Sequence, residues 1–162
     1  MDLFCDFVGS GGTFSGTSQY LKEVNPNVKC FIVEPQSAPI LATGTITRSG
    51  HKVIVSNIRL EQVYNCFTQI QGGGYSMDKE TLTLLDDMKT VDGFLQVSDE
   101  EVIQTCQLLA QKEGIFSGFS AGANVLGATH LLRRKEHQGK TVVVLLCDSG
   151  MKYLSTDLWG EL

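Results

Sequence analysis

The segment from Asp6 to Gly16, DFVGSGGTFSG, holds the residues whose types and spacing most directly suggest chemistry. Its glycines would let a ligand approach the backbone closely, and its hydroxyls could bond to that ligand. The residues concerned are Gly9, Ser10, Gly11, Gly12 and Thr13. A helix that begins here would direct its unpaired N–H groups and the positive end of its dipole to the same place. The segment therefore predicts a binding site for an anion.

Three other interpretations of this loop compete with that prediction. A tight turn without a ligand is favoured by a single glycine, but not by a loop with several. A nucleoside triphosphate loop needs Gly-Lys-Ser/Thr, and no lysine precedes Lys22. A dinucleotide loop starting at Gly9 would need glycine where Phe14 stands, although Glu34 lies where a ribose-binding acid is expected. Binding of a nicotinamide dinucleotide therefore stays open as the alternative.

Strands and helices alternate around the loop. An apolar strand over 3–8 precedes it, a helix follows it as far as Asn25-Pro26, and a second strand covers 30–33. The face expected to be buried on this helix consists of Phe14, Thr17, Tyr20, Leu21 and Val24. A strand, a helix and a strand within about 30 residues are typical of a right-handed parallel crossover.

The rest of the chain continues this alternation. A strand over 93–97 leads into a helix with a capping box, Ser98 and Glu101, and Gly114 suits the end of that helix. A small-residue turn, a helix and an apolar strand follow, over 117–122, about 123–134 and 142–147. The last strand is apolar at every position, which predicts burial on both faces. We predict an α/β fold, a three-layer sandwich with a mostly parallel sheet, whose post-strand loops meet at one ligand site.

Composition indicates a globular protein, with 162 residues, 42% hydrophobic and 19% charged, and a net charge of -5. No stretch approaches the roughly 20 apolar residues of a membrane span, and the sequence start lacks the basic region of a signal peptide. The only basic cluster is Arg133-Arg134-Lys135. We expect a cytoplasmic protein with neither a membrane nor a nucleic-acid partner. Five cysteines without C-x-x-C spacing indicate core residues rather than disulfides or zinc ligands.

An ordered set of motifs resembles the cysteine synthase and cystathionine β-synthase family. The segments are Val8–Gly16, Asn25-Pro26, Val33-Glu34-Pro35, Gly50-His51-Lys52, Ile70-Gln71-Gly72, Val97–Glu101, Glu113-Gly114, Gly118–Gly122 and Asp148–Thr156. The glycine-rich turn alone would be a weak signal, whereas the ordered set spans nearly the whole chain. The resemblance implies a fold type II enzyme that uses pyridoxal phosphate, with 1–162 forming part of a tryptophan synthase β-like domain.

The resemblance also implies roles for individual residues. The cofactor phosphate would be bound by Gly9, Ser10, Gly11, Gly12 and Thr13. Ser120 would hydrogen-bond the pyridine nitrogen, an environment that suits β-elimination and replacement. Ser120 would also suit a helix N-cap, and Glu34 would be structural. An amino-acid substrate and a homodimer are implied for the full-length parent.

The family's Schiff-base lysine and substrate loop have no counterpart in this sequence. No lysine lies in a matching context, so no catalytic residue is carried over. We interpret the chain as the latter half of a family member and expect it to be inactive alone. Residues 53–69, VIVSNIRLEQVYNCFTQ, are interpreted as a non-family insertion. We hypothesise a translated intron, and a lineage-specific surface loop is the alternative, because loop insertions cost little.

Three functions follow from the sequence. The first is a fragment of a pyridoxal phosphate-dependent β-replacement enzyme of sulfur amino acid metabolism. The second is a non-catalytic truncated isoform that interacts with a full-length relative through surfaces left uncovered. The third is a nicotinamide-dependent oxidoreductase domain. The glycine spacing Gly72-Gly73-Gly74-Tyr75 departs from the family's substrate-side loop and leaves the acceptor open.

Overall fold

A four-stranded parallel sheet with the order β5-β2-β1-β6 organises the protein. The computed structural model describes residues 1–37, 39–43, 46–48, 51–53, 68–71 and 88–160. The strands of the sheet are β1 (Leu3–Phe7), β2 (Lys29–Pro35), β5 (Gly93–Val97) and β6 (Val142–Val144). A separate antiparallel pair consists of β3 (Ile46–Arg48) and β4 (His51–Val53). The expected insertion over 53–69 lies almost entirely outside the described residues.

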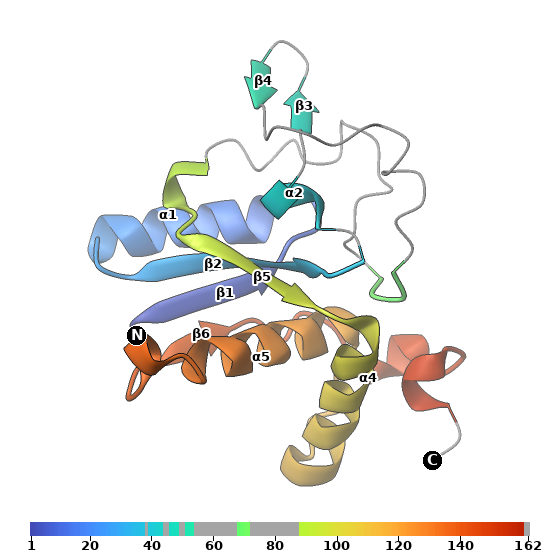
Figure 1. Ribbon diagram of the computed structural model, residues 1–162. Coiled ribbons are helices and arrows are strands. Elements are labelled where there is room, and N and C mark those ends of the chain that lie inside the picture. The colour runs from blue at the N-terminus through green and yellow to red at the C-terminus, as the bar shows by residue number, and fades with distance from the viewer. Residues whose placement is uncertain (38, 44–45, 49–50, 54–67, 72–87, 161–162) are drawn as a thin grey trace.

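Helices cover both faces of the sheet, as Figure 1 shows. Helix α1 (Gly12–Val24) lies on one face, and α5 (Phe119–Leu132) lies on the other with α4 (Asp99–Leu108) beside it. The short elements are α2 (Ile40–Thr43), η1 (Met88–Thr90), η2 (Leu109–Glu113), η3 (Lys135–His137), η4 (Gly150–Tyr153) and η5 (Asp157–Trp159). The predicted α/β sandwich with a parallel sheet is confirmed. Among the described residues, no helix has the length and apolar character that crossing a bilayer requires.

Strand β1 is buried along its whole length and divides the core into two clusters. Leu3, Cys5 and Phe7 pack on the side of α4 and α5, whereas Phe4 packs on the side of α1. On that side Phe14 of α1 is fully buried and stacks on Phe4, with ring centroids 6.0 Å apart. Two-sided burial is what a central strand of a covered parallel sheet requires.

The face predicted to be buried on α1 is only partly right. Phe14 is buried, but Tyr20 and Val24 are 64% and 67% exposed, and the other buried residues of the helix are Ser15 and Ser18. These small serines let the helix backbone approach its neighbours, which an apolar-only pattern does not anticipate. Tyr20 and Val24 consequently face away from the core of the described chain.

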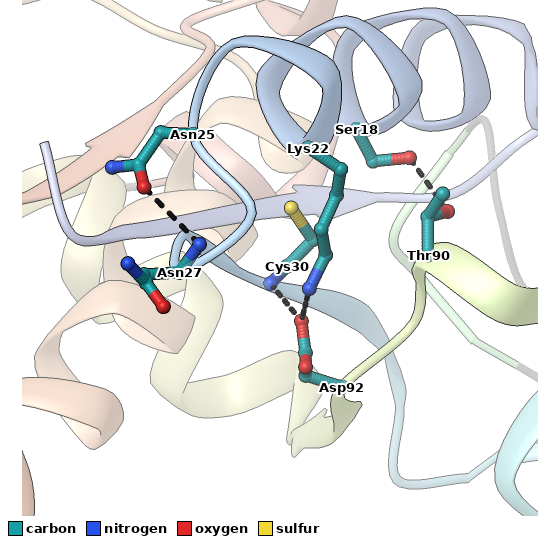
Figure 2. Close-up of polar contacts among 7 residues, drawn as sticks. All are labelled: Ser18, Lys22, Asn25, Asn27, Cys30, Thr90 and Asp92. Atoms are coloured by element: carbon teal, nitrogen blue, oxygen red, sulfur yellow. Dashed lines mark hydrogen bonds and ion pairs between the residues drawn. The ribbon is translucent and has the colours of Figure 1, made fainter.

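A polar cluster fastens α1 to the strands beneath it (Figure 2). The Asp92 carboxylate accepts from Lys22 Nζ and from the Cys30 amide, so one side chain joins α1, β2 and the entry to β5. Close by, the hydroxyls of Ser18 and Thr90 lie 2.8 Å apart. These bonds hold η1 and the start of β5 against the first crossover unit.

The predicted capping residues lie at both ends of the helical stretch that begins with α4. Ser98 accepts from the Glu101 amide at 3.3 Å, which confirms the predicted start of α4. Gly114 has the left-handed φ of 68° that suits it to the end of the helical stretch.

Helices α4 and α5 pack closely because α5 carries a glycine at their contact. A Cβ placed on Gly122 would lie 2.2 Å from Cys106 Sγ and 3.1 Å from the Val102 carbonyl oxygen. A Cβ at position 122 therefore requires movement of the Cys106 side chain or of α4.

Strand β6 contradicts the prediction of a long strand buried on both faces. It covers three residues, and Val143, Leu145 and Leu146 are about 40% exposed (39%, 43% and 42%). In the described chain β6 is an edge strand with β1 as its one neighbour. An apolar run predicts a buried environment, but cannot say whether the covering residues belong to the same chain.

Two helical glycines give a matched test of this packing. Gly122→Ala should lower the free energy of unfolding by about 1–3 kcal/mol, because the new methyl group overpacks the contact with Cys106. Gly16→Ala, in an exposed turn of α1 with no atom within 4 Å of a new Cβ, should raise it by about 0.5–1 kcal/mol. Urea unfolding followed by circular dichroism measures both changes.

The double variant Gly122→Ala/Cys106→Ala should recover part of the loss, because it removes the atom nearest to the new methyl group. Equal destabilisation by Gly122→Ala with and without Cys106 would contradict the packing described for α4 and α5.

Candidate functional site

All six residues predicted from the sequence line one cavity of about 200 Å³. The cavity lies at the carboxyl end of β1, where parallel α/β sheets usually bind ligands. The predicted lining residues are Gly9, Ser10, Gly11, Gly12, Thr13 and Ser120, and the others are Asp6, Phe7, Val8, Phe14, Leu145 and Cys147. The glycine loop and the start of α5, more than a hundred residues apart in sequence, therefore face the same space.

The glycine loop presents the open amino end of α1 to the cavity. Gly11 is the N-cap of α1 and has a φ of 90°, a left-handed conformation that favours glycine. It has no side chain to bond the first N–H groups of the helix. These groups are therefore available to an external acceptor, and the helix dipole favours an anionic one.

Ser120 lies in the first turn of α5, on the opposite side of the sheet from α1. Its hydroxyl donates to the Gln71 carbonyl oxygen at 3.0 Å. The N-cap of α5 is Gly118, so the interpretation of Ser120 as an N-cap is wrong. The Asp148 carboxylate supplies the cap from outside the helix and accepts from the Ala121 amide at 3.1 Å.

Asn124, which no sequence pattern singled out, connects the parts of the site. Its side chain is fully buried one helical turn after Ser120, accepts from the Phe7 amide and donates to the Leu145 carbonyl oxygen at 2.9 Å. It also donates to Asp6 Oδ1 at 3.2 Å. The spacing of four residues from Ser120 was a signal that could have identified it, since residues four apart share a helix face.

Asp6 is the second residue that no sequence pattern singled out. It is 4% exposed and stands in a strand that is otherwise apolar. Burial raises the pKa of Asp6 to about 6, against the opposing effect of hydrogen bonds from Asn124 and Phe7. A polar residue inside an apolar strand is the sequence signal that was available.

Glu34 is not placed to bind a ribose. Its carboxylate is 1% exposed and accepts from the amides of Leu41 and Ala42 at 2.8 and 3.0 Å, capping α2. Burial raises the pKa of Glu34 to about 7 despite these two bonds. The structural role expected for Glu34 is confirmed, and this observation counts against the dinucleotide interpretation.

The described cysteines and histidines form no metal site, and no group of three or more possible ligands exists among the described residues. Cys5, Cys30 and Cys106 are buried free thiols, whereas Cys147 is an exposed free thiol beside the cavity. Burial raises the pKa of Cys106 to about 11, so its thiol is neutral near pH 7. Three of these four cysteines are core residues, as predicted, and the fifth cysteine, Cys66, lies outside the described residues.

Fold and site together define the class: a parallel α/β protein with a glycine-loop cavity at a helix start, at the carboxyl end of its sheet. The family model for pyridoxal-phosphate dependent enzymes matches residues 1–148. The chain belongs to this pyridoxal phosphate-dependent family. Its curated relatives include a cysteine synthase of Buchnera aphidicola, 33% identical over the whole chain, and cysteine synthase A of Escherichia coli, 32% identical over the whole chain.

Solved structures agree with this membership. O-acetyl serine sulfhydrylase isoform 3 of Entamoeba histolytica matches with a TM-score of 0.78 and 28% identity over the whole chain. A hydrogen sulfide-producing enzyme of Fusobacterium nucleatum matches with a TM-score of 0.75 and 35% identity over 95% of the chain. The chain spans less than half of these proteins, 47% and 46% of the two curated relatives and 42% and 44% of the two structures.

The cavity suits the phosphate of the family's cofactor. Its uncapped helix start and hydroxyl-bearing loop offer neutral donors, the usual partners of a phosphate at a helix amino terminus. Ser120, on the cavity wall, carries a neutral hydroxyl. Among the described residues of the lining, Asp6 carries the one carboxyl group, and its raised pKa keeps it largely protonated up to about pH 6.

Replacement of Asp6 tests the electrostatics of the cavity. Its folded-state pKa lies above the unfolded value, so the folded protein loses stability as pH rises from about 4 to 6. Asp6→Asn should therefore be more stable than the wild type at pH 7.5, by about 3 kcal/mol, and about equally stable near pH 3. Thermal or urea unfolding across this range measures the difference.

Asp2→Asn, at the other end of β1, is the matched control. A hydrogen bond from Thr141 lowers the pKa of Asp2, so this change should bring no gain at pH 7.5. A pH-independent effect of Asp6→Asn would show that the Asp6 carboxyl titrates alike in the folded and unfolded chains.

Proposed function

We propose that this chain is the cofactor-phosphate part of a β-replacement enzyme of sulfur amino acid metabolism, similar to cysteine synthase. The observation that carries the proposal is the shared cavity of the glycine loop and Ser120. Family membership and cysteine synthase relatives support the same reaction class. In the full-length protein the reaction would form cysteine from an activated serine, in a cytoplasmic homodimer.

In this proposal each part of the cavity has one task. The residues Gly9–Thr13 and the start of α1 bind the phosphate through N–H groups and hydroxyls, which anchors and orients the cofactor. Ser120 donates to the pyridine nitrogen, after its hydroxyl turns from the Gln71 carbonyl oxygen. When bound, pyridoxal phosphate supplies an electron sink for chemistry at the substrate α- and β-carbons.

The chain provides no catalytic residue in this proposal. Among the described residues no lysine lines the cavity, and no lysine of the sequence stands in the context of the family's cofactor lysine. Without an amine to hold the cofactor and move the substrate's α-proton, the chain binds the cofactor but does not catalyse the reaction. The missing lysine and the substrate loop belong to the parent protein.

A second function, a non-catalytic isoform that binds a full-length relative, is favoured by the exposed edge strand. The apolar residues Val143, Leu145 and Leu146 are about 40% exposed on or directly after β6. An unpaired edge with apolar side chains is a surface suited to another chain. Binding a full-length relative would cover this surface without any catalysis by the chain itself.

Binding of pyridoxal phosphate tests the proposed function. The chain should bind pyridoxal phosphate more tightly than pyridoxal, because only the former carries the group that the glycine loop binds. Ser120→Ala should weaken the binding of pyridoxal phosphate about 5- to 30-fold, because one hydrogen bond is lost. Ser155→Ala, a control at an exposed position, should leave the affinity unchanged. Equilibrium dialysis measures the affinities of the wild type and of both variants. Equal affinity of the wild type for pyridoxal phosphate and for pyridoxal would contradict the proposal.

Sedimentation of a mixture tests the second function. The chain and a full-length relative from the same genome should form a complex at micromolar concentrations. Leu145→Ser should weaken the complex at least tenfold, whereas Leu154→Ser, at an exposed site away from β6, should leave it unchanged. Independent sedimentation of the two wild-type proteins would rule out the truncated-isoform function.

A further inference from the structure

The cavity contains one ionisable carboxyl group that the proposed function does not use. Asp6 lines the same space as Gly9–Thr13 and Ser120, at the end of the strand that leads into the glycine loop. It is 4% exposed, and its Oδ1 accepts from Asn124 Nδ2 at 3.2 Å. A carboxylate beside an anion in a buried place is repulsive, whereas a protonated carboxyl can donate a hydrogen bond to it.

We propose that Asp6 makes anion binding at the glycine loop conditional on a proton. The loop binds its anion when the Asp6 carboxyl is protonated and loses affinity when that carboxyl ionises. The inference rests on the proposed function, because it takes the glycine loop to be the anion site. It adds a proton as a second ligand of that site.

The charges around Asp6 support this coupling. No lysine, arginine or histidine lines the cavity among the described residues, so none of them compensates two negative charges there. The pKa of Asp6 is raised to about 6 by burial, which places its ionisation within the physiological range. Because the Asp6 carboxyl is buried, its negative charge would repel an anion beside it more strongly than it would in bulk water.

The neighbouring ionisable groups do not replace Asp6 in this role. On its own strand Cys5 has a pKa raised to about 12, and after β6 Cys147 has one raised to about 11, so both thiols are neutral where Asp6 titrates. Asp148 is paired with the Ala121 amide and the Tyr153 hydroxyl. Glu34, at the end of β2, has a raised pKa but does not line the cavity. Helices α1 and α5 present only the neutral lining residues Gly12, Thr13, Phe14 and Ser120 to it.

Linkage gives the size of the effect. If the ionised form does not bind, the apparent affinity falls tenfold for each pH unit above the pKa of Asp6. Between pH 6 and pH 8 the wild-type chain should lose between tenfold and a hundredfold in affinity. Asp6→Asn keeps an acceptor for Asn124 and removes the charge, so its affinity should stay level over this range.

Sulfate is the probe for this experiment, because it stays a dianion from pH 5 to pH 8. Phosphate esters are unsuitable, since their own second ionisation falls near pH 6. Sulfate affinity of the full chain, Asp6→Asn and the control Asp2→Asn is measured by calorimetry at half-unit steps of pH. Repeating the pH 7 titration in buffers of different ionisation enthalpy should show proton uptake for the wild type and for Asp2→Asn, and none for Asp6→Asn.

The outcomes separate this inference from the function on which it rests. A sulfate affinity of the wild type that does not change with pH would overturn the role of Asp6 while leaving the anion site in place. The same pH dependence of sulfate affinity in the wild type and in Asp6→Asn would do so too. No sulfate binding by either protein at any pH would instead overturn the anion site itself, and with it both proposals. Circular dichroism at each pH confirms that the compared proteins are folded.

Discussion

The buried amide of Asn124 is the interaction on which the geometry of the site depends. Its oxygen accepts from the Phe7 amide, and its nitrogen donates to Asp6 and to the Leu145 carbonyl oxygen. The ends of β1 and β6 are therefore fixed to α5 by a single side chain in a place without bulk water. Because buried polar groups are costly when unpaired, this arrangement favours one register of helix against sheet. The glycine loop and Ser120 face one cavity as a result.

Much of the fold could be predicted from local patterns in the sequence. The β1-α1-β2 crossover, the capping box of α4 and the strand β5 follow from apolar periodicity, helix-capping residues and glycine or proline breaks. Six cavity residues followed from the glycine spacing and from the order of the family's motifs. These features are encoded by residues close together in the sequence, so a reading of short windows finds them.

The errors and omissions share a different cause. Tyr20, Val24 and the predicted strand over 142–147 were expected to be buried, and Tyr20, Val24, Val143, Leu145 and Leu146 are exposed because no part of the described chain covers them. Asp6 and Asn124 were missed because their importance comes from a contact between residues 118 positions apart. The local signals, a four-residue spacing from Ser120 and a polar residue in an apolar strand, do not reveal this contact. The burial and pairing of such residues therefore depend on partners that are distant in the sequence, which short sequence windows do not include.

The Asp92 cluster has a consequence for how this chain tolerates change. Asp92 holds the entry of β5 to β2 and to α1 through bonds that lie next to the strand itself. The alignment of β5 on β2 is thus supported by contacts at the strand's own start. Since lengthening a loop carries only a small entropic cost, the connection between β2 and β5 is a place where evolution can add or remove residues without disturbing the sheet. Variation in gene structure can accumulate there while the architecture around the cavity persists.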